Sequence, residues 1–331
     1  MQTEVAVTIR TFHVADYEAI TAIHNANFGP EFMKEPEELC FWDEHREDYC
    51  KMERWVAEAE GKVVAFGEYS QSGHMYDPHK FSLNISVLPE YYLRGIGRRL
   101  YDLVVREVSR FDPVQLDEWT REDMACRIGF LERRGFVPDM RMWTSLLDLS
   151  EFDPSRFADV VRSVSDQGIA LRSFEELGVN DADVRRKIYE LWLELRHDVP
   201  APPGIERSAV SFERYWEASD RPSRWPAGYF IALDGSDFVG LSQLWLSPAE
   251  PFVLRTGLTG TLRTHRRRGI AMALKVRALD VAKQAGYRYA KTENESNNVG
   301  MLAINEILGF KKNPAWVHYA KKLNPNNVDS R

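Results

Sequence analysis

An internal repeat constrains this 331-residue chain more than any other feature of its sequence. Three landmarks occur twice and in the same order. A short apolar strand, a loop and a helix begin at Thr8 and again at Ala170, and a glycine turn precedes a helix at Gly95 and at Gly269. The third landmark is a Gly-Phe pair, in the segments FLERRGFVP and INEILGFKK. Three ordered repeats indicate a duplicated domain.

Each half shows the pattern of a mixed α/β domain. Alternating apolar residues on both sides of Glu60-Gly61 and of Asp234-Gly235 predict a hairpin in each half. The predicted order is strand, helices, hairpin, strand, helix, strand, helix and strand. Each half is expected to close on its own last strand, MRMWTSLLDL or AWVHYAKKL. The predicted fold class is α/β, with two tandem domains that each have a mixed central sheet flanked by helices.

The length of the chain agrees with two domains, since one domain per about 150 residues is usual. We predict an N-terminal domain over residues 1–150, a linker over 151–168 and a C-terminal domain over 169–331. The proline-rich segment RHDVPAPPGIERS, which starts at Arg196, is predicted to be a loop because proline interrupts a helix.

Charge and cysteine content narrow the class of protein. A formal net charge of -7 argues against a general nucleic-acid binder. Cys40, Cys50 and Cys126 form no CxxC pair, so neither a disulfide framework nor a metal site is predicted. The first residues lack the pattern of a signal peptide, and no segment approaches the roughly 20 apolar residues of a membrane span. We therefore expect a cytoplasmic protein that binds no membrane.

The glycine turns predict an anion site. A strand that enters a glycine turn and then a helix directs unpaired backbone N–H groups and the positive end of the helix dipole to one point. In the second half, small residues at Gly269 and Ala271 let an anion approach the backbone, and three arginines precede them. Neither turn has the pattern of a Walker loop or of a dinucleotide fingerprint. A basic helix cap on a surface loop is the alternative interpretation of R-x-x-G-x-A alone.

The combination of strand, R-x-x-G-x-A turn, helix, strand and NNVGMLAINEILGF resembles the GNAT acetyltransferase superfamily. Its presence in both halves resembles the tandem GNAT proteins of the mycothiol synthase type. The resemblance extends from about Thr8 to Leu146 and from Ala170 to Leu323, and it is more specific in the second half. It implies a GNAT domain twice over, with acetyl-CoA as the cosubstrate and its pyrophosphate at the turn.

The resemblance also implies roles for individual residues. Thr259, Gly260 and Thr261 would lie on the strand that binds the pantetheine arm, and Asn294 and Asn298 would lie beside the coenzyme; Asn298 is equally a good helix cap. The pyrophosphate would be held by Arg266, Arg267, Arg268, Gly269, Ile270 and Ala271. In the first half, the coenzyme contacts would be Val87, Arg94, Gly95 and Gly97.

The resemblance leaves the acid and the base of the reaction less defined. Many GNAT enzymes have a tyrosine four residues before the glycine of the Gly-Phe landmark, but Asn305 and Leu131 stand there in this chain. Asn305 is predicted to be the catalytic residue, as a hydrogen-bond donor to the leaving sulfur. Asp198 is predicted to contact the substrate. Glu293 and Glu295 are candidates for the general base, which we leave open.

Two functional hypotheses follow. The first is an N-acetyltransferase in which the C-terminal half acts on a small-molecule amine, and which exists as a monomeric pseudo-dimer or a homodimer. The first half is expected to be the weaker coenzyme binder, because Tyr92 stands at the position of Arg266. The alternative is a non-catalytic acyl-CoA-binding or scaffold protein, which the missing tyrosine favours.

Overall fold

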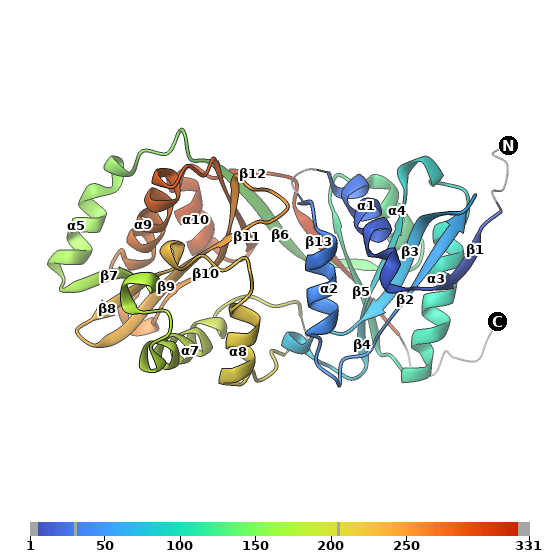
Figure 1. Ribbon diagram of the computed structural model, residues 1–331, viewed down its shortest axis with the longest axis horizontal. Helices are drawn as coiled ribbons and strands as arrows, with labels where there is room; N and C mark the ends of the chain where they lie inside the picture. The colour runs from blue at the N-terminus through green and yellow to red at the C-terminus, as the bar shows by residue number, and fades with distance from the viewer. Residues whose placement is uncertain (1–5, 30–31, 204–205, 324–331) are drawn as a thin grey trace. The chain divides into compact units, whose positions relative to one another are not determined.

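The structure is a computed structural model, and it describes residues 6–29, 32–203 and 206–323 (Figure 1). Its internal contacts divide the chain into two compact units. The N-terminal unit comprises the described residues of Met1–Met140, Ala201–Ala209 and Val317–Arg331. The C-terminal unit comprises Arg141–Pro200 and the described residues of Val210–Trp316. None of the described helices is long and apolar enough to cross a membrane.

The strands of the N-terminal unit lie in the order β1-β2-β3-β4-β5-β13. The pairs β1/β2, β2/β3 and β3/β4 are antiparallel, whereas β4 and β5 are parallel. The predicted hairpin at Glu60-Gly61 is confirmed, since both residues have positive φ between β2 and β3. The strand bounds are Thr8–Thr11 for β1, Met52–Ala59 for β2, Lys62–Ser70 for β3, Lys80–Val87 for β4, Gln115–Arg121 for β5 and Trp316–Lys322 for β13.

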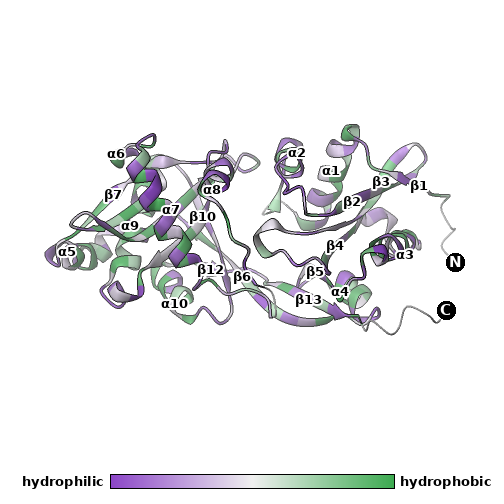
Figure 2. Cartoon of the chain, turned by 90° about the horizontal axis from the view of Figure 1, so that it is seen from below, coloured by the Kyte–Doolittle hydropathy of each residue, from purple (hydrophilic) through white to green (hydrophobic). Residues whose placement is uncertain are grey.

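Helices cover both faces of these strands (Figure 2). Helices α1 (Tyr17–Phe28) and α2 (Pro36–Glu44) lie on one side, and α3 (Ile96–Val108) and α4 (Ala125–Glu132) on the other. Neighbouring strand residues point to opposite faces, so Val56 packs with α1 and Ala57 with α3. The buried residues of α3 follow the period of an amphipathic helix: Ile96, Leu100, Tyr101, Val104 and Val108.

The strands of the C-terminal unit lie in the order β6-β11-β10-β9-β8-β7, and β12 also pairs with β6. The pair β10/β11 is parallel, and the others are antiparallel. The strand bounds are Val137–Asp148 for β6, Ile169–Ser173 for β7, Phe230–Asp234 for β8, Asp237–Leu246 for β9, Val253–Thr261 for β10, Tyr289–Glu295 for β11 and Lys311–Lys312 for β12.

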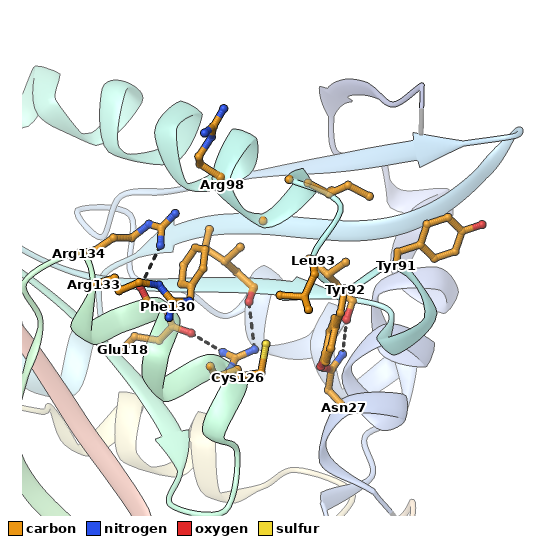
Figure 3. A pocket seen from close by; sticks show the side chains of 16 residues that line it. Asn27, Tyr91, Tyr92, Leu93, Arg98, Glu118, Cys126, Phe130, Arg133 and Arg134 are labelled. Atoms are coloured by element: carbon orange, nitrogen blue, oxygen red, sulfur yellow. Dashed lines mark hydrogen bonds and ion pairs between the residues drawn. The ribbon is translucent and has the colours of Figure 1, made fainter. Parts of the chain in front are cut away.

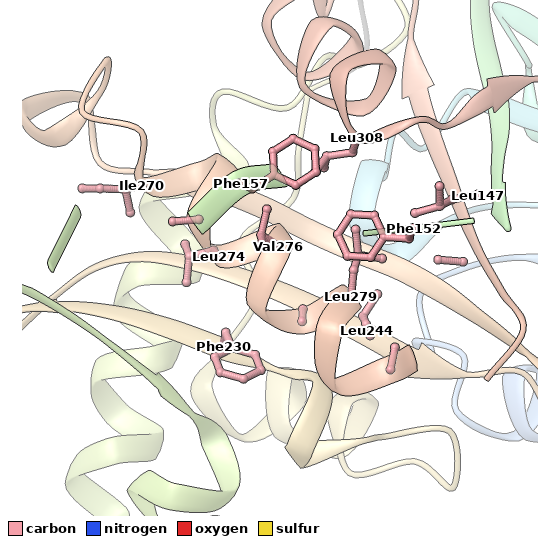
Figure 4. Packing of buried hydrophobic residues seen from close by; sticks show 14 of the residues in the cluster. Leu147, Phe152, Phe157, Phe230, Leu244, Ile270, Leu274, Val276, Leu279 and Leu308 are labelled. Atoms are coloured by element: carbon pink, nitrogen blue, oxygen red, sulfur yellow. The ribbon is translucent and has the colours of Figure 1, made fainter. Parts of the chain in front are cut away.

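Two hydrophobic clusters also lie on opposite faces of this sheet. Phe230 belongs to the cluster under α5, α9 and α10 (Figure 4), whereas its neighbour Ile231 belongs to the cluster under α6, α7 and α8. The helix bounds are Ala158–Asp166 for α5, Phe174–Leu177 for α6, Ala182–Arg196 for α7, Phe212–Ser219 for α8, Ile270–Gln284 for α9 and Val299–Leu308 for α10.

A constant sequence offset relates the second part of each repeat. Gly95 and Gly269 are 174 residues apart, and so are Gly135 and Gly309. The same offset maps β5 onto β11 residue by residue, and it maps the starts of α3 and α4 onto those of α9 and α10. Residues related by this offset are therefore structural counterparts.

The closing strands differ from the expectation that each half ends on its own strand. Residues 141–148 of β6 belong to the C-terminal unit, where they pair with β11, and β13 lies beside β5 in the N-terminal unit. Both strands follow a Gly-Phe landmark and have similar apolar patterns, so local sequence does not distinguish which sheet each one joins. The predicted domain boundaries, 1–150 and 169–331, stay a prediction. The compact units differ from them, since the C-terminal unit begins at Arg141 and β13 belongs to the N-terminal unit.

Strand β13 contributes a buried histidine to the N-terminal unit. His318 is 1% exposed; its Nδ1 lies 2.5 Å from Asp139 Oδ1, and its Nε2 lies 3.6 Å from Asp117 Oδ1. Burial alone would lower the pKa of His318, but the hydrogen bonds and charges of the two aspartates raise it above its usual value. The imidazolium therefore stabilises the attachment of β13.

The stabilisation by His318 should depend on pH. A histidine whose pKa is raised on folding contributes its full stabilisation below the pKa of the unfolded chain, about 6.5, and loses it as pH rises through the folded-state pKa. We expect His318→Gln to lower the free energy of unfolding more at pH 6 than at pH 9, as measured by urea denaturation. An equal loss at both pH values would show that His318 acts only by packing.

Candidate active site

A left-handed turn precedes α3 in one unit and α9 in the other. Gly95 and Gly269 have φ of 80° and 81°, and the residues two positions earlier, Leu93 and Arg267, have φ of 60° and 63°. Left-handed residues at this spacing turn successive backbone N–H groups toward one concave site, and the first N–H groups of the helix point to the same place. Both turns therefore have the backbone geometry of an anion site.

An opening between strands leads to the turn in the C-terminal unit. Strands β10 and β11 pair only where Val253–Arg255 face Tyr289–Lys291, while β11 stays paired with β6 as far as Glu295. The opposite side of β10 has a bulge against β9 between Thr256 and Thr259. A bulge bends its strand and ends regular pairing. Beyond Arg255, the edge of β10 toward β11 is thus available to an extended ligand.

A chain of polar side chains crosses this opening. Thr256 Oγ1 donates to Thr292 Oγ1 at 2.6 Å, Thr292 Oγ1 lies 3.4 Å from Asn294 Oδ1, and Asn305 Nδ2 donates to Asn294 Oδ1 at 2.6 Å. Asn305 is 3% exposed, and its Oδ1 has no hydrogen-bond partner among the described residues. The structure thus brings together Asn294 and Asn305, which the sequence analysis assigned to the site separately.

The other predicted residues of β10 follow the bulge. Thr259 shares a hydrogen bond of 2.9 Å with Ser242, and a Cβ added to Gly260 would lie 3.3 Å from the side chain of Leu195. Thr261 is 7% exposed, and its hydroxyl has no hydrogen-bond partner among the described residues.

Asp198 lies among the arginines of the turn. Its carboxylate accepts hydrogen bonds from Arg263, at 2.6 Å, and from Arg266. The hydrogen bond from Arg263, and to a smaller extent the charge of Arg266, holds the pKa of Asp198 below its usual value. Asp198 was predicted to contact the substrate, and the structure places its charge against the predicted phosphate ligand Arg266.

Of the remaining residues of the turn, Arg268 makes side-chain contacts within the protein, whereas Ile270 can offer a ligand only its backbone. Arg268 donates to Gln167 at 2.9 Å and lies 3.7 Å from Asp234. The side chain of Ile270 is 2% exposed in the core, so only its backbone can face a ligand, and Ala271 lies in the first turn of α9.

The start of α10 is organised by two polar residues. The side-chain oxygen of Asn298 accepts from the backbone of Met301 at 3.3 Å, which confirms the helix-cap interpretation. Glu295 accepts from the backbone and the side chain of Asn297, at 2.7 and 3.0 Å, so it orders the preceding loop.

Glu293 is the acidic residue on β11 that stays a candidate base. Its side chain is exposed, yet desolvation by the surrounding protein raises its pKa against the opposing charges of Arg255 and Lys291. A carboxylate with a raised pKa is the better proton acceptor of the two candidates.

The N-terminal unit has a well-defined pocket below its glycine turn (Figure 3). The pocket has a volume of about 250 Å³ and lies between β4, the start of α3 and α4. The predicted residues Val87, Gly95 and Gly97 line it, whereas Arg94 lies over the ring of Tyr91 and lines a separate pocket.

Charged and aromatic side chains that sequence reasoning missed also line this pocket. Arg127 donates to Glu118, and Tyr92 donates to Asn27 (Figure 3). Burial raises the pKa of Glu118 to about 7 against the opposing effect of Arg127. The sequence of β5, QLDEWTR, has several polar and charged residues, so no local signal singled out Glu118. The N-terminal unit thus combines the backbone geometry of an anion site with a buried ion pair beside it.

These features define the class of the protein. Strands that diverge beside a left-handed turn and a helix, present once in each unit, are the architecture of two tandem acyl-CoA N-acyltransferase domains. The model of the acetyltransferase (GNAT) family matches residues 17–136 and 188–310, and the chain belongs to this family. No curated protein sequence matches the chain.

Solved structures support the same fold. A GCN5-related N-acetyltransferase from Sphaerobacter thermophilus has a TM-score of 0.70 at 19% identity, covering 96% of this chain and 95% of that one. A tandem GNAT protein from the clavulanic acid biosynthesis pathway has a TM-score of 0.72 at 16% identity, covering 97% of this chain and all of that one (100%). At these identities the likeness concerns the fold.

Proposed function

We propose that the protein transfers an acetyl group from acetyl-CoA to the amine of a small molecule, and that the C-terminal half performs the reaction. One observation carries the proposal: the bulged and diverging strand β10 leads directly into the turn from Arg266 to Ala271. In the N-terminal unit, β4 pairs with β3 without any shift of register. The bulge therefore distinguishes the half that we propose to be catalytic.

The residues of this half fit the coenzyme. The turn offers backbone N–H groups to a pyrophosphate, and Arg266 to Arg268 supply positive charge. The edge of β10 beyond Arg255 offers N–H and C=O groups that pair with the amides of an extended arm, as in strand addition. A backbone N–H aimed at the developing oxyanion contributes roughly 2.7–4 kcal/mol to transition-state stabilisation.

Proton transfer is the second requirement. An ammonium group with a pKa of about 10.4 must lose its proton, which costs about 4.6 kcal/mol at pH 7. We assign this task to Glu293, because desolvation raises its pKa and so makes it a better proton acceptor than an ordinary surface carboxylate. The leaving thiolate has a pKa of about 8.5, so it departs without an acid if a donor such as Asn305 stabilises it.

Asn305 should assist the reaction without being essential. Its amide is already hydrogen-bonded to Asn294, and a neutral hydrogen bond contributes only about 0.5–1.5 kcal/mol. We expect Asn305→Ala to lower kcat about tenfold or less and to leave acetyl-CoA affinity unchanged. Complete loss of turnover with intact affinity would assign Asn305 a larger catalytic role.

The release of free CoA thiol on addition of an amine library tests the proposed activity. Steady, amine-dependent release supports it. Acetyl-CoA binding without release for any amine class would favour the second candidate, a non-catalytic acyl-CoA-binding protein. The observation that favours that candidate is the presence of Asn305 and Leu131 where an acidic hydroxyl is expected.

A further inference from the structure

The pocket of the N-terminal unit has a marked excess of positive charge. Four arginines and one glutamate line it, among them Arg98, Arg133 and Arg134. Arg134 is held in place by a hydrogen bond of 2.9 Å to the carbonyl of Phe130 and by the ring of Phe130, whose centroid lies 3.5 Å from its guanidinium. Together with the N–H groups of the Gly95 turn, these side chains make the mouth of the pocket suitable for phosphate.

The strand opening in this unit is occupied by a side chain of the protein. Strands β4 and β5 pair only at Lys80–Ser82 and then diverge, as β10 and β11 do. Arg127, from α4, reaches into this opening. It donates to the carbonyl of Ile85 at 3.0 Å, to the hydroxyl of Ser86 at 3.2 Å and to the carboxylate of Glu118. The guanidinium therefore joins the two diverging strands and uses the edge of β4.

The counterparts in the C-terminal unit have no charge. By the 174-residue offset, Glu118 corresponds to Thr292 and Arg127 to Met301. Thr292 takes part in the neutral polar chain described above. The ion pair is therefore a second difference between the two openings, in addition to the bulge of β10.

Unused hydrogen-bonding atoms at this ion pair also indicate a ligand. Glu118 is 4% exposed and lines the pocket, and its Oε2 has no hydrogen-bond partner among the described residues; the same is true of Arg127 Nε. Buried polar atoms without partners are costly, and they are accounted for if a bound molecule supplies a hydroxyl, which can donate to Glu118 and accept from Arg127.

We infer that Arg127 and Glu118 close the strand opening of the N-terminal unit, so that its pocket takes the phosphate-bearing nucleotide end of a coenzyme A-type ligand and excludes the acyl-carrying arm. Only the identity of the nucleotide rests on the proposed function. The arm would need the carbonyl of Ile85, which Arg127 already occupies. The N-terminal half is then a nucleotide site and not a second acyltransferase.

The test compares two probes on the full chain carrying Gly269→Glu, which removes the contribution of the C-terminal turn. The probes are acetyl-CoA and adenosine 3′-phosphate 5′-diphosphate, which is the coenzyme without its arm, and calorimetry measures both. We expect dissociation constants within about threefold of each other, because the arm adds no contact. Glu118→Thr with Arg127→Met, the pattern of the other unit, should shift the ratio of the two dissociation constants at least about tenfold in favour of acetyl-CoA, because it opens the path of the arm and removes polar atoms that are assigned to the nucleotide.

Arg133→Met is the matched control, because it removes a pocket arginine outside the opening. It should weaken both probes and leave their ratio unchanged. If the double variant melts early, Glu118→Gln with Arg127→Gln is measured in its place, with the same expected selective gain for acetyl-CoA. Binding of acetyl-CoA about tenfold or more tightly than the nucleotide before any change at Arg127 would overturn the inference. So would the absence of nucleotide binding. This test measures binding and not turnover, so it can be interpreted even if the proposed acetyltransferase activity is not found.

Discussion

Gly269→Glu should abolish acetyl-CoA-dependent turnover, whereas Gly95→Glu should leave most of it. The substitution at 269 adds a negative charge where backbone N–H groups and Arg266 are expected to meet phosphate. Loss of a charged contact typically removes about 1.5–3 kcal/mol, which weakens binding tenfold to hundredfold, and repulsion adds to this loss. The measurement is calorimetric affinity for acetyl-CoA together with turnover of whichever amine is active.

The two glycines are well matched as controls for misfolding. Both have a left-handed φ, so a side chain strains both turns by about 1–2 kcal/mol. They differ in surroundings, since a Cβ at Gly269 would lie 3.5 Å from Val164 and 3.6 Å from Val160, whereas one at Gly95 would have no atom within 4 Å. Thermal melts must therefore accompany the assay. Equal losses of turnover in two folded variants would refute the assignment of catalysis to the C-terminal half.

Lys275→Met should make the protein more stable at neutral pH. Lys275 lies on α9 and is 3% exposed, with its ammonium 5.2 Å from the centroid of the Phe310 ring. Desolvation by burial lowers the pKa of Lys275 to about 8. The difference from its value in the unfolded chain corresponds to about 3 kcal/mol of lost stability at pH 7. Methionine fills similar space and keeps a favourable contact with the ring.

The gain should also depend on pH. Because the pKa is lowered on folding, the unfolded chain binds the extra proton between about pH 8 and 10.5, and the stability of the unsubstituted protein rises over that range. We expect the advantage of the variant in urea denaturation to be largest below pH 8 and smaller at pH 10. The counterpart Tyr101→Phe, which removes a buried hydroxyl, should stabilise by about 1 kcal/mol or less. A destabilised Lys275→Met protein would contradict this account.

Periodic and repeated features of the fold were predictable from sequence. The turns at Gly95 and Gly269, the hairpin at Glu60-Gly61 and the Asn298 cap follow from local backbone chemistry, so short segments were enough to identify them. The partner of each closing strand was not predictable. A period of two identifies β6 and β13 as strands, but sheet order is decided by contacts between residues far apart in sequence.

The candidate site shows the same limit. The comparison of the two halves identified Tyr92 as a departure from Arg266, and the family resemblance identified Asn305 as a departure from the expected tyrosine. It did not show that Arg127 extends from α4 to Ile85 on β4, because that contact joins residues 42 positions apart through side-chain geometry. The pairing of Asp198 with Arg263 and Arg266 likewise depends on the path of a loop that has no regular pattern.

The placement of β6 and β13 bears on how such a protein can evolve. If the gene were split at the linker, the N-terminal product would end in β6, whose partner β11 is in the other product, and it would lack β13. The C-terminal product would contain β13 without its neighbour β5 and would lack β6. Both would expose unpaired sheet edges and would be prone to aggregate. When two duplicated domains have exchanged their closing strands, neither folds properly without the other. We therefore expect the two to remain in one gene, even if only one of them is catalytically active.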